Sequence, residues 1–177
     1  RPLSSTNLPT ATSHRKRLQR ALLDLRVLGE EDLAALLKGI ESSGEPLELA
    51  LVKAGKLKRE QLGPLLSRLY NMRYVDVAGA ELTEQLLSVF PEEFMREKKV
   101  LPISNAGGRL EVALVEPADR TTLDEITFMT GMRPQVAVTS ELDFLEACQK
   151  YFNDTFASNL IETLNTSSQH MAGDAMS

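Results

Sequence analysis

Apolar positions in the first part of the chain recur at spacings of three and four, and β-branched residues are few there. This period matches the turn of an α-helix, so it predicts a run of amphipathic helices over residues 15–72. Gly29, Gly44 and Gly55 separate the helical stretches. From Arg73 onward, short β-branched stretches alternate with helical ones, which predicts a half of different architecture.

In this second half the pattern predicts short strands near residues 74–77, 100–104, 110–115 and 135–139. Helices are expected near residues 83–89, 91–97, 122–130 and 141–152. The sequence Asn105-Ala106-Gly107-Gly108 predicts a hairpin turn. The predicted fold class is therefore α+β, with an N-terminal helical layer followed by a small α/β subdomain that contains a short mixed sheet.

The two ends of the chain show no periodic apolar pattern. Residues 1–13 are rich in Ser, Thr and Pro and are predicted to form a disordered leader. We expect residues 154–177 to be a linker or tail that leads to a further domain of the natural chain. Between the ends we place a duplicated helical subdomain over residues 14–72 and an α/β subdomain over residues 73–153.

The helical part contains an internal repeat with an offset of 29 residues. The two copies are RLQRALLDLRVLGEEDLAALLKGI (residues 17–40) and PLELALVKAGKLKREQLGPLLSRL (residues 46–69). The offset pairs equivalent leucines, among them Leu18 with Leu47, Leu22 with Leu51 and Leu33 with Leu62. Each copy is predicted to be a helix, a tight turn and a second helix. Neither copy can bury its apolar face alone, so we expect a four-helix layer with a pseudo-twofold axis.

The repeat resembles the tandem motif of the MshEN domain, also known as the type II secretion E-protein N-terminal domain. This domain precedes the ATPase core in secretion and type IV pilus assembly motors. The resemblance continues through Val100-Leu101-Pro102-Ile103, the stretch LEVALV at residues 110–115 and Glu116-Pro117-Ala118-Asp119, and covers roughly residues 15–152. It implies a regulatory or docking domain of such a motor.

In this family, intact repeats imply binding of cyclic di-GMP. Arginines suit guanine edges and phosphates, glycines let the backbone approach a ligand, and leucines form the floor of the site. The resemblance assigns these roles to Arg17, Leu18, Leu22, Arg26, Leu47, Leu51, Val52 and Gly55.

The chain departs from the family motif at Gln19, Arg26, Pro46, Glu48 and Leu69. Pro46 removes a guanidinium that contributes roughly 1–3 kcal/mol as a bidentate contact. Glu48 places a negative charge where a dianionic ligand would lie. We therefore expect a degenerate cyclic di-GMP site and a repeat retained mainly as architecture, and we predict no other cofactor.

Charge and composition narrow the classes of function. The net charge of −5 argues against a nucleic-acid partner. Basic residues before Asp24 suit a phosphate, an anionic membrane or an acidic partner, or belong to a solvated leader. No apolar run approaches the roughly 20 residues of a membrane span, and no signal peptide is visible. The single Cys148 fits a reducing compartment. We predict a cytoplasmic protein that reaches the membrane only peripherally, through its partner.

Candidate catalytic residues are scarce. The chain has no G-x4-G-K-[ST] phosphate loop. His14 and His170 both fall in ends that we predict to be disordered, so neither is expected to act as a base or a metal ligand. Cys148 lies in an apolar helical pattern and is predicted to be a core residue. We predict no catalytic site and no metal site.

The leading functional prediction is a non-catalytic docking and regulatory domain of a type II secretion or type IV pilus assembly ATPase. The expected partner is an inner-membrane assembly platform protein or the C-terminal ATPase core. The alternatives are a cyclic di-GMP sensor that uses the tandem motif and an unrelated small enzyme.

Overall fold

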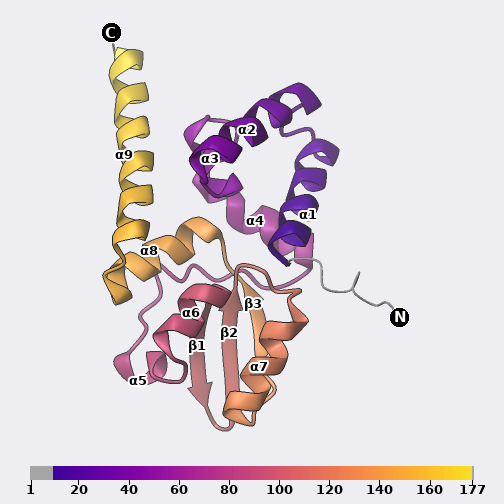
Figure 1. Ribbon diagram of the computed structural model, residues 1–177, viewed down its shortest axis with the longest axis vertical. Helices are drawn as coiled ribbons and strands as arrows, with labels where there is room; N and C mark the ends of the chain where they lie inside the picture. Colours follow the sequence, from indigo (N-terminus) through magenta and orange to yellow (C-terminus); the bar gives the residue numbers. More distant parts are fainter. Residues whose placement is uncertain (1–9, 177) are drawn as a thin grey trace.

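The computed structural model describes the backbone of residues 10–176 and the side chains of residues 14–166. The helical layer comes first, and its helices α1 to α4 lie together at one end of the molecule (Figure 1). They are α1 (Thr10–Asp24), α2 (Glu30–Ser43), α3 (Leu47–Lys53) and α4 (Arg59–Tyr70). Residues 1–9 of the predicted leader lie outside the described residues. Residues 10–13 of that leader are helical, because α1 begins at Thr10.

The helical layer has the pseudo-twofold arrangement that the repeat predicts. The second helix of each copy packs against the first helix of the other copy, so that α2 contacts α3 and α1 contacts α4. The paired leucines fill the space between the helices: Leu18 and Leu47, Leu22 and Leu51, Leu28 and Leu57, and Leu33 and Leu62 are all buried. The helical layer therefore packs around a hydrophobic core, to which Leu142 and Leu164 from the C-terminal part of the chain also contribute.

The α/β half contains a three-stranded mixed sheet in the order β1-β2-β3. Strand β1 (Val100–Ala106) is antiparallel to β2 (Arg109–Leu114), and β2 is parallel to β3 (Gln135–Val138). Gly107 and Gly108 form the predicted hairpin turn, with φ angles of 62° and 75°. These left-handed values suit two glycines and a tight connection between antiparallel strands.

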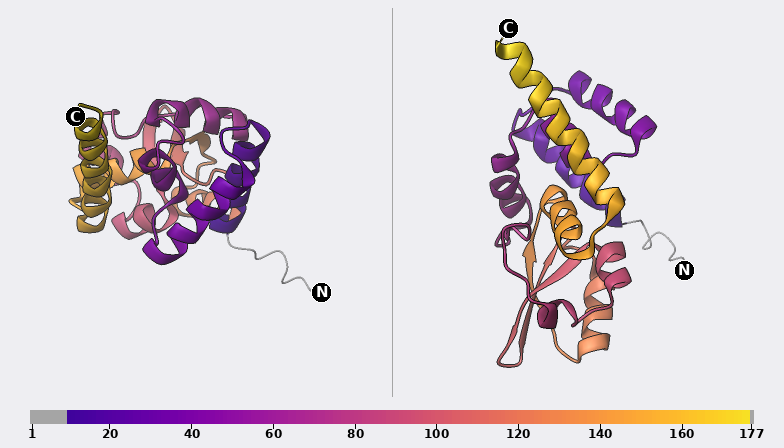
Figure 2. Two further views of the ribbon diagram at one scale, coloured as in Figure 1. Left: turned by 90° about the horizontal axis from the view of Figure 1, so that it is seen from above. Right: turned by 90° about the vertical axis from the view of Figure 1, so that its left-hand side faces the viewer.

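Helices connect and cover this sheet. They are α5 (Glu84–Leu87), α6 (Glu92–Lys98), α7 (Arg120–Thr130) and α8 (Glu141–Phe152). Figures 1 and 2 show α6 and α7 on the same face of the sheet. Side-chain caps fix two of the helix starts: Asp119 accepts from the Thr122 amide, and Ser140 accepts from the Asp143 amide at 3.0 Å. The predicted fold class, α+β with a helical layer before a small α/β subdomain, is confirmed.

The predicted strand at residues 74–77 is wrong. Only a single parallel bridge joins Tyr74 to Val138 there. The chain turns directly afterwards, because the Asp76 carboxylate accepts hydrogen bonds from the amides of Ala78 and Gly79, both at 3.0 Å. Such a side-chain turn ends the extended conformation before a second ladder contact can form.

Residues 154–177 were predicted to be a linker or tail, but a helix, α9 (Thr155–Met176), forms there. Its first turns belong to the folded body, because Ala157, Ile161 and Leu164 are buried. Ala157 and Ile161 join the core of the α/β half, whereas Leu164 joins the core of the helical layer. Figures 1 and 2 show that α9 begins beside α8 and extends away from the sheet, along the side of the helical layer. The helices of the described part of the chain are all too short or too polar to cross a bilayer.

We predict that Ile161→Ala destabilises the chain by about 2–5 kcal/mol, because it removes buried methylene groups and leaves a cavity where α9 packs on the α/β half. Denaturant unfolding measures the difference. The control is Glu162→Ala, the exposed neighbour on the same helix, which we expect to change the free energy of unfolding by less than about 0.5 kcal/mol. Equal effects of the two substitutions would contradict the packing of α9.

Candidate functional site

The two turns inside the repeat have the same geometry. After α1 the amide of Val27 donates to the carbonyl of Leu22 at 2.9 Å, and after α3 the amide of Lys56 donates to Leu51 at 3.0 Å. The residue before each donor has a left-handed backbone, with a φ of 57° at Arg26 and 71° at Gly55. This is the usual way for a helix to end on a left-handed residue. The offset seen in the sequence is thus a structural repeat.

Arg26 is strained at this position, whereas Gly55 is not. A side chain at a left-handed φ costs roughly 1–2 kcal/mol because its Cβ approaches the following carbonyl oxygen. The family motif has glycine at both turns. The first copy keeps the turn although arginine has replaced the glycine.

The residues that the resemblance assigns to a ligand lie in different environments. Leu18, Leu22, Leu47 and Leu51 are buried core residues, and Val52 is partly buried against them. Arg17 is exposed, and its guanidinium carbon lies 5.5 Å from the centre of the Tyr70 ring, which is a cation–π distance. Arg26 and Gly55 lie in the two turns. Arg17 and Arg26 do not share a pocket.

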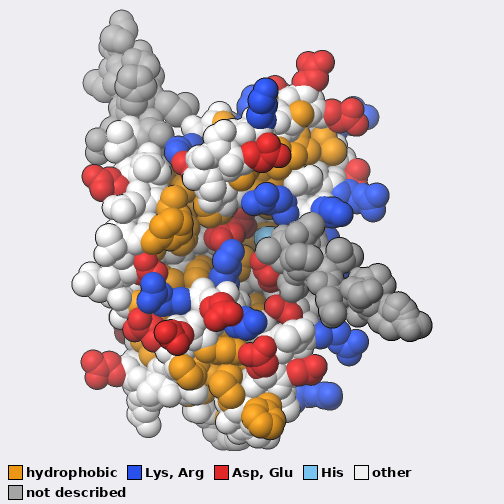
Figure 3. All heavy atoms as spheres, in the orientation of Figure 1, with side chains coloured by type: hydrophobic (Ala, Val, Ile, Leu, Met, Phe, Trp, Pro, Cys, Tyr) orange, Lys and Arg blue, Asp and Glu red, His pale blue; other side chains and the backbone are white. Residues whose placement is uncertain are grey.

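The structure brings two of the assigned residues together at a cavity between the two halves. Leu18 and Leu47, the first leucines of the two copies, line this cavity of about 310 Å³. Its opposite wall comes from α8 and α9, through side chains that include Phe144, Cys148 and Leu160. Figure 3 shows the hollow in the middle of one face, with basic and acidic side chains around it. This cavity is the candidate functional site.

The cavity contains polar atoms that have no hydrogen-bond partner. They are Nε2 of His14 and Oε1 of Glu48, and both side chains are buried. His14 pairs through its other ring nitrogen with the Tyr70 hydroxyl. Burial, together with the positive charges of Lys99 and Arg17, lowers the pKa of His14 to about 4, so the ring is neutral at pH 7.

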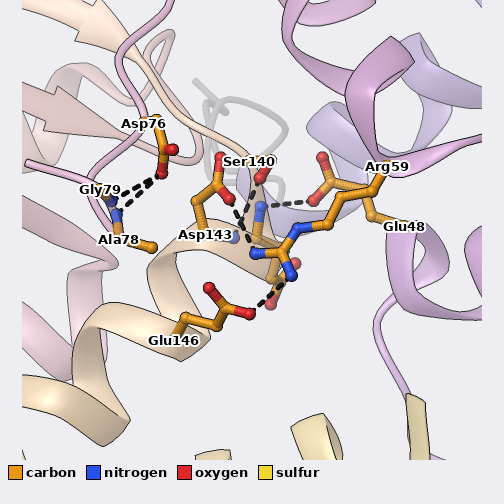
Figure 4. A network of polar contacts seen from close by, with 9 residues as sticks. Glu48, Arg59, Asp76, Ala78, Gly79, Ser140, Asp143 and Glu146 are labelled. Atoms are coloured by element: carbon orange, nitrogen blue, oxygen red, sulfur yellow. Dashed lines mark hydrogen bonds and ion pairs between the residues drawn. The ribbon is translucent and has the colours of Figure 1, made fainter. Parts of the chain in front are cut away.

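Glu48 connects the repeat to the α/β half. Its Oε2 accepts a hydrogen bond of 2.6 Å from the amide of Glu141, at the N-terminus of α8 (Figure 4). Burial raises the pKa of Glu48 to about 8, and the negative charge of Glu141 adds to this effect. We expected Glu48 to repel a ligand through its charge. In the structure the Glu48 carboxyl is buried instead, and its pKa of about 8 keeps it mainly protonated at pH 7.

Ion pairs lie at the same junction. Arg59 of α4 donates to Asp143 at 2.9 Å and to Glu146 at 2.6 Å, both on α8 (Figure 4). Lys99, which follows α6, donates to Glu141 at 2.6 Å. These contacts hold three segments around the cavity, and none of them presents a reactive group.

The chemistry available around the cavity is limited. Burial raises the pKa of the Cys148 thiol to about 12, which keeps it protonated and unreactive. Among the described residues, no group of three or more His, Cys, Asp or Glu side chains is arranged to hold a metal ion. The arrangement suits the attachment of one half to the other better than acid–base catalysis.

Sequence reasoning missed the polar residues of this site. His14 was assigned to a disordered end, but it is buried in α1 four residues before Leu18, on the same face of the helix. Glu48 is flanked by leucines in the stretch PLELALV. An acidic residue in an apolar helical run is a signal for a buried carboxyl, and it was available from the sequence.

Comparisons with known proteins agree with this architecture. The type IV pilus assembly ATPase PilB of Myxococcus xanthus is 25% identical over 136 residues, which cover 77% of this chain and 24% of PilB. PilB of Thermus thermophilus is 27% identical over 139 residues, covering 77% of this chain and 16% of that protein. The chain therefore spans a quarter or less of the curated relatives that it matches.

Solved structures share the fold. The structure of MshE with cdg has a TM-score of 0.56 and 21% identity, and the match covers 76% of this chain and 97% of that one. The N-terminal domain of XpsE has a TM-score of 0.55 and 19% identity, with 78% and 95% covered. The class of protein is thus a small α+β domain with the fold of the XpsE N-terminal domain. The chain belongs to the MshEN domain family, whose pattern matches residues 70–158, about half of its length.

Because of the strain at Arg26, we predict that substitutions at the two turns change the free energy of unfolding in opposite directions. Arg26→Gly is expected to stabilise the chain by about 1 kcal/mol, because it removes the left-handed strain. Gly55→Ala, at the equivalent turn, is expected to destabilise it by about 1 kcal/mol for the same reason. Thermal or denaturant unfolding measures both. Changes of the same sign would show that the two turns are not equivalent.

Proposed function

We propose that this chain is the non-catalytic N-terminal domain of a type IV pilus or type II secretion assembly ATPase, and that it docks onto the cytoplasmic part of an inner-membrane platform protein. The supporting observation is its membership of the MshEN family together with the PilB relatives, of which it covers only a small share. A cytoplasmic location, with membrane attachment only through the partner, accords with this role.

The docking surface that we propose lies on α7, in the α/β half. Phe128 is 91% exposed, and its neighbour Met129 is also exposed. These two side chains border a shallow hollow together with Thr121, Asp124 and Glu125. A large aromatic side chain that is exposed on a folded helix buries much apolar surface when a partner covers it. Aromatic residues of this kind contribute most of the binding free energy in many interfaces.

The acidic rim suits a partner segment with basic and apolar residues. The C-terminal ATPase core is the other candidate partner. Binding measurements with each partner in isolation distinguish the two.

We expect Phe128→Ala to weaken binding to the cytoplasmic region of the platform protein by about tenfold or more, which corresponds to the loss of an interface hot spot. The matched control is Phe156→Ala, which alters an aromatic residue that is 65% exposed on α9. Surface plasmon resonance with the purified partner measures both, and the thermal midpoint of each variant checks its folding. Unchanged affinity for Phe128→Ala would exclude α7 as the docking surface.

A cyclic di-GMP sensor is the second candidate function. It is favoured by the retained turns and by the approach of Leu18 and Leu47 at one cavity. Glu48 also lines this cavity, where its carboxyl is engaged with α8.

Because of that carboxyl and the arginine missing at Pro46, we expect calorimetry with micromolar cyclic di-GMP to give no binding heat. Heat that Arg17→Ala reduces would establish the sensor instead.

A further inference from the structure

Glu48 is the most deeply buried acidic side chain among the described residues, with 1% of its surface exposed. It belongs to α3 in the helical layer, and its hydrogen bond to the Glu141 amide reaches across to the α/β half. Its second oxygen has no partner. None of the ion pairs between described residues includes it. Burying a carboxyl with only one of its two oxygens hydrogen-bonded costs free energy, so a contact of this kind between two halves is unusual.

The groups that face Glu48 compensate its charge only in part. They come from five segments: His14 of α1, Tyr70 of α4, Lys99 before β1, Glu116 after β2, and Glu141 and Asp143 of α8. His14 is neutral, and burial raises the pKa of the Tyr70 hydroxyl to about 12, which keeps it neutral as well. Lys99 is paired with Glu141, and Asp143 with Arg59.

The lining of the cavity also includes both acidic and basic side chains. Arg15, Glu45, Arg96 and Asp154 are among them, and Asp154 pairs with Arg96 at 3.2 Å. Glu45 pairs with Lys53. These side chains therefore add little net charge to the field at Glu48, and the cost of ionising this carboxyl is set by its burial.

We propose that Glu48 is a protonation-controlled latch: its neutral carboxyl stays buried between the helical layer and the first turn of α8, whereas its ionised form favours opening of this junction to water, because burial without a partner for the second oxygen disfavours the charge. The latch needs only contacts within this chain. It is therefore independent of the docking function proposed above.

The direction of the pH effect follows from the two states. The pKa of Glu48 is about 8 in the folded chain, against 4.5 for an unperturbed glutamate. Burial is the main cause, followed by Glu141, and both outweigh the Glu141 amide and Lys99, which favour the charged form. A group with a raised pKa contributes stability that is complete below pH 4.5 and is lost as the pH rises through 8. The latch is thus closed in acid and released in alkali.

Cys148 reports the release. It is the only cysteine of the chain, it is buried, and it lines the same cavity as Glu48. Because only 2% of its surface is exposed, a thiol reagent reaches it faster when the walls of the cavity separate. Thiol ionisation also increases with pH, but the ratio of labelling rates between two variants at the same pH cancels that effect.

The test compares the labelling rate of Cys148 in the wild-type chain and in Glu48→Gln between pH 6 and pH 9. We expect the ratio of wild-type rate to variant rate to rise by about tenfold or more over this range, because only the wild-type latch ionises. Glu45→Gln is the matched control, since it removes a carboxyl from the lining of the same cavity. Its ratio to the wild type is expected to stay constant with pH.

A wild-type to Glu48→Gln ratio that does not change with pH overturns the proposal. If Glu48→Gln fails to fold, Glu48→Met replaces it, because methionine has a similar length and does not titrate. If the ratio of the wild-type labelling rate to the Glu48→Met rate rises with pH, the latch is supported. If this ratio stays constant with pH, the latch is excluded.

Discussion

The first turn of α8 holds the two halves of this molecule together. A helix begins with amide groups that have no partner within the helix, and these must be satisfied when the helix start is buried. Ser140 satisfies one of them locally, at the amide of Asp143. Glu48 satisfies another from a different half, at the amide of Glu141. One of the contacts that fix the helical layer relative to the sheet is therefore a hydrogen bond to the start of a helix in the other half.

The charged groups beside this bond contribute more to the orientation of the two halves than to the stability of the junction. Arg59 reaches two carboxylates on α8, and the Asp143 side chain is largely buried in the process. Taking charges out of water cancels much of their mutual attraction, whereas removing one partner leaves an uncompensated charge. The apolar contribution comes from Leu142 of α8 and Leu164 of α9, which insert into the core of the helical layer. The buried leucines therefore stabilise the junction, and the polar groups select one orientation of the two halves.

The local features of the fold could be predicted from the sequence. The repeat offset, the glycine hairpin and the Ser140 cap each depend on residues that are close in sequence, so periodicity and turn chemistry are sufficient to predict them. The helical start of α9 was also visible in principle, because Ala157, Ile161 and Leu164 have the spacing of one helix face. Its Ser and Thr content hid the pattern. The strand expected at residues 74–77 failed because Asp76 turns the chain, and an Asx turn competes with any ladder.

The polar part of the site could not be predicted in the same way. The burial of His14 depends on Tyr70, which lies 56 positions further along the chain. The partner of Glu48 is 93 positions away. No local pattern contains such contacts. A single sequence shows that an acid interrupts an apolar run, but it does not show which helix start will receive that acid.

Two of the positions at which this chain departs from the family motif, Arg26 and Glu48, have different physical consequences. At Arg26 the backbone still needs the left-handed turn, so the substitution stores strain and the shape survives. At Glu48 the new side chain reaches out of the repeat and binds the other half. A ligand that bound against Leu18 and Leu47 would meet this carboxyl at the wall of the cavity. The same side chain therefore lines the cavity and joins the two halves, so that the wall of the site and the junction share one carboxyl.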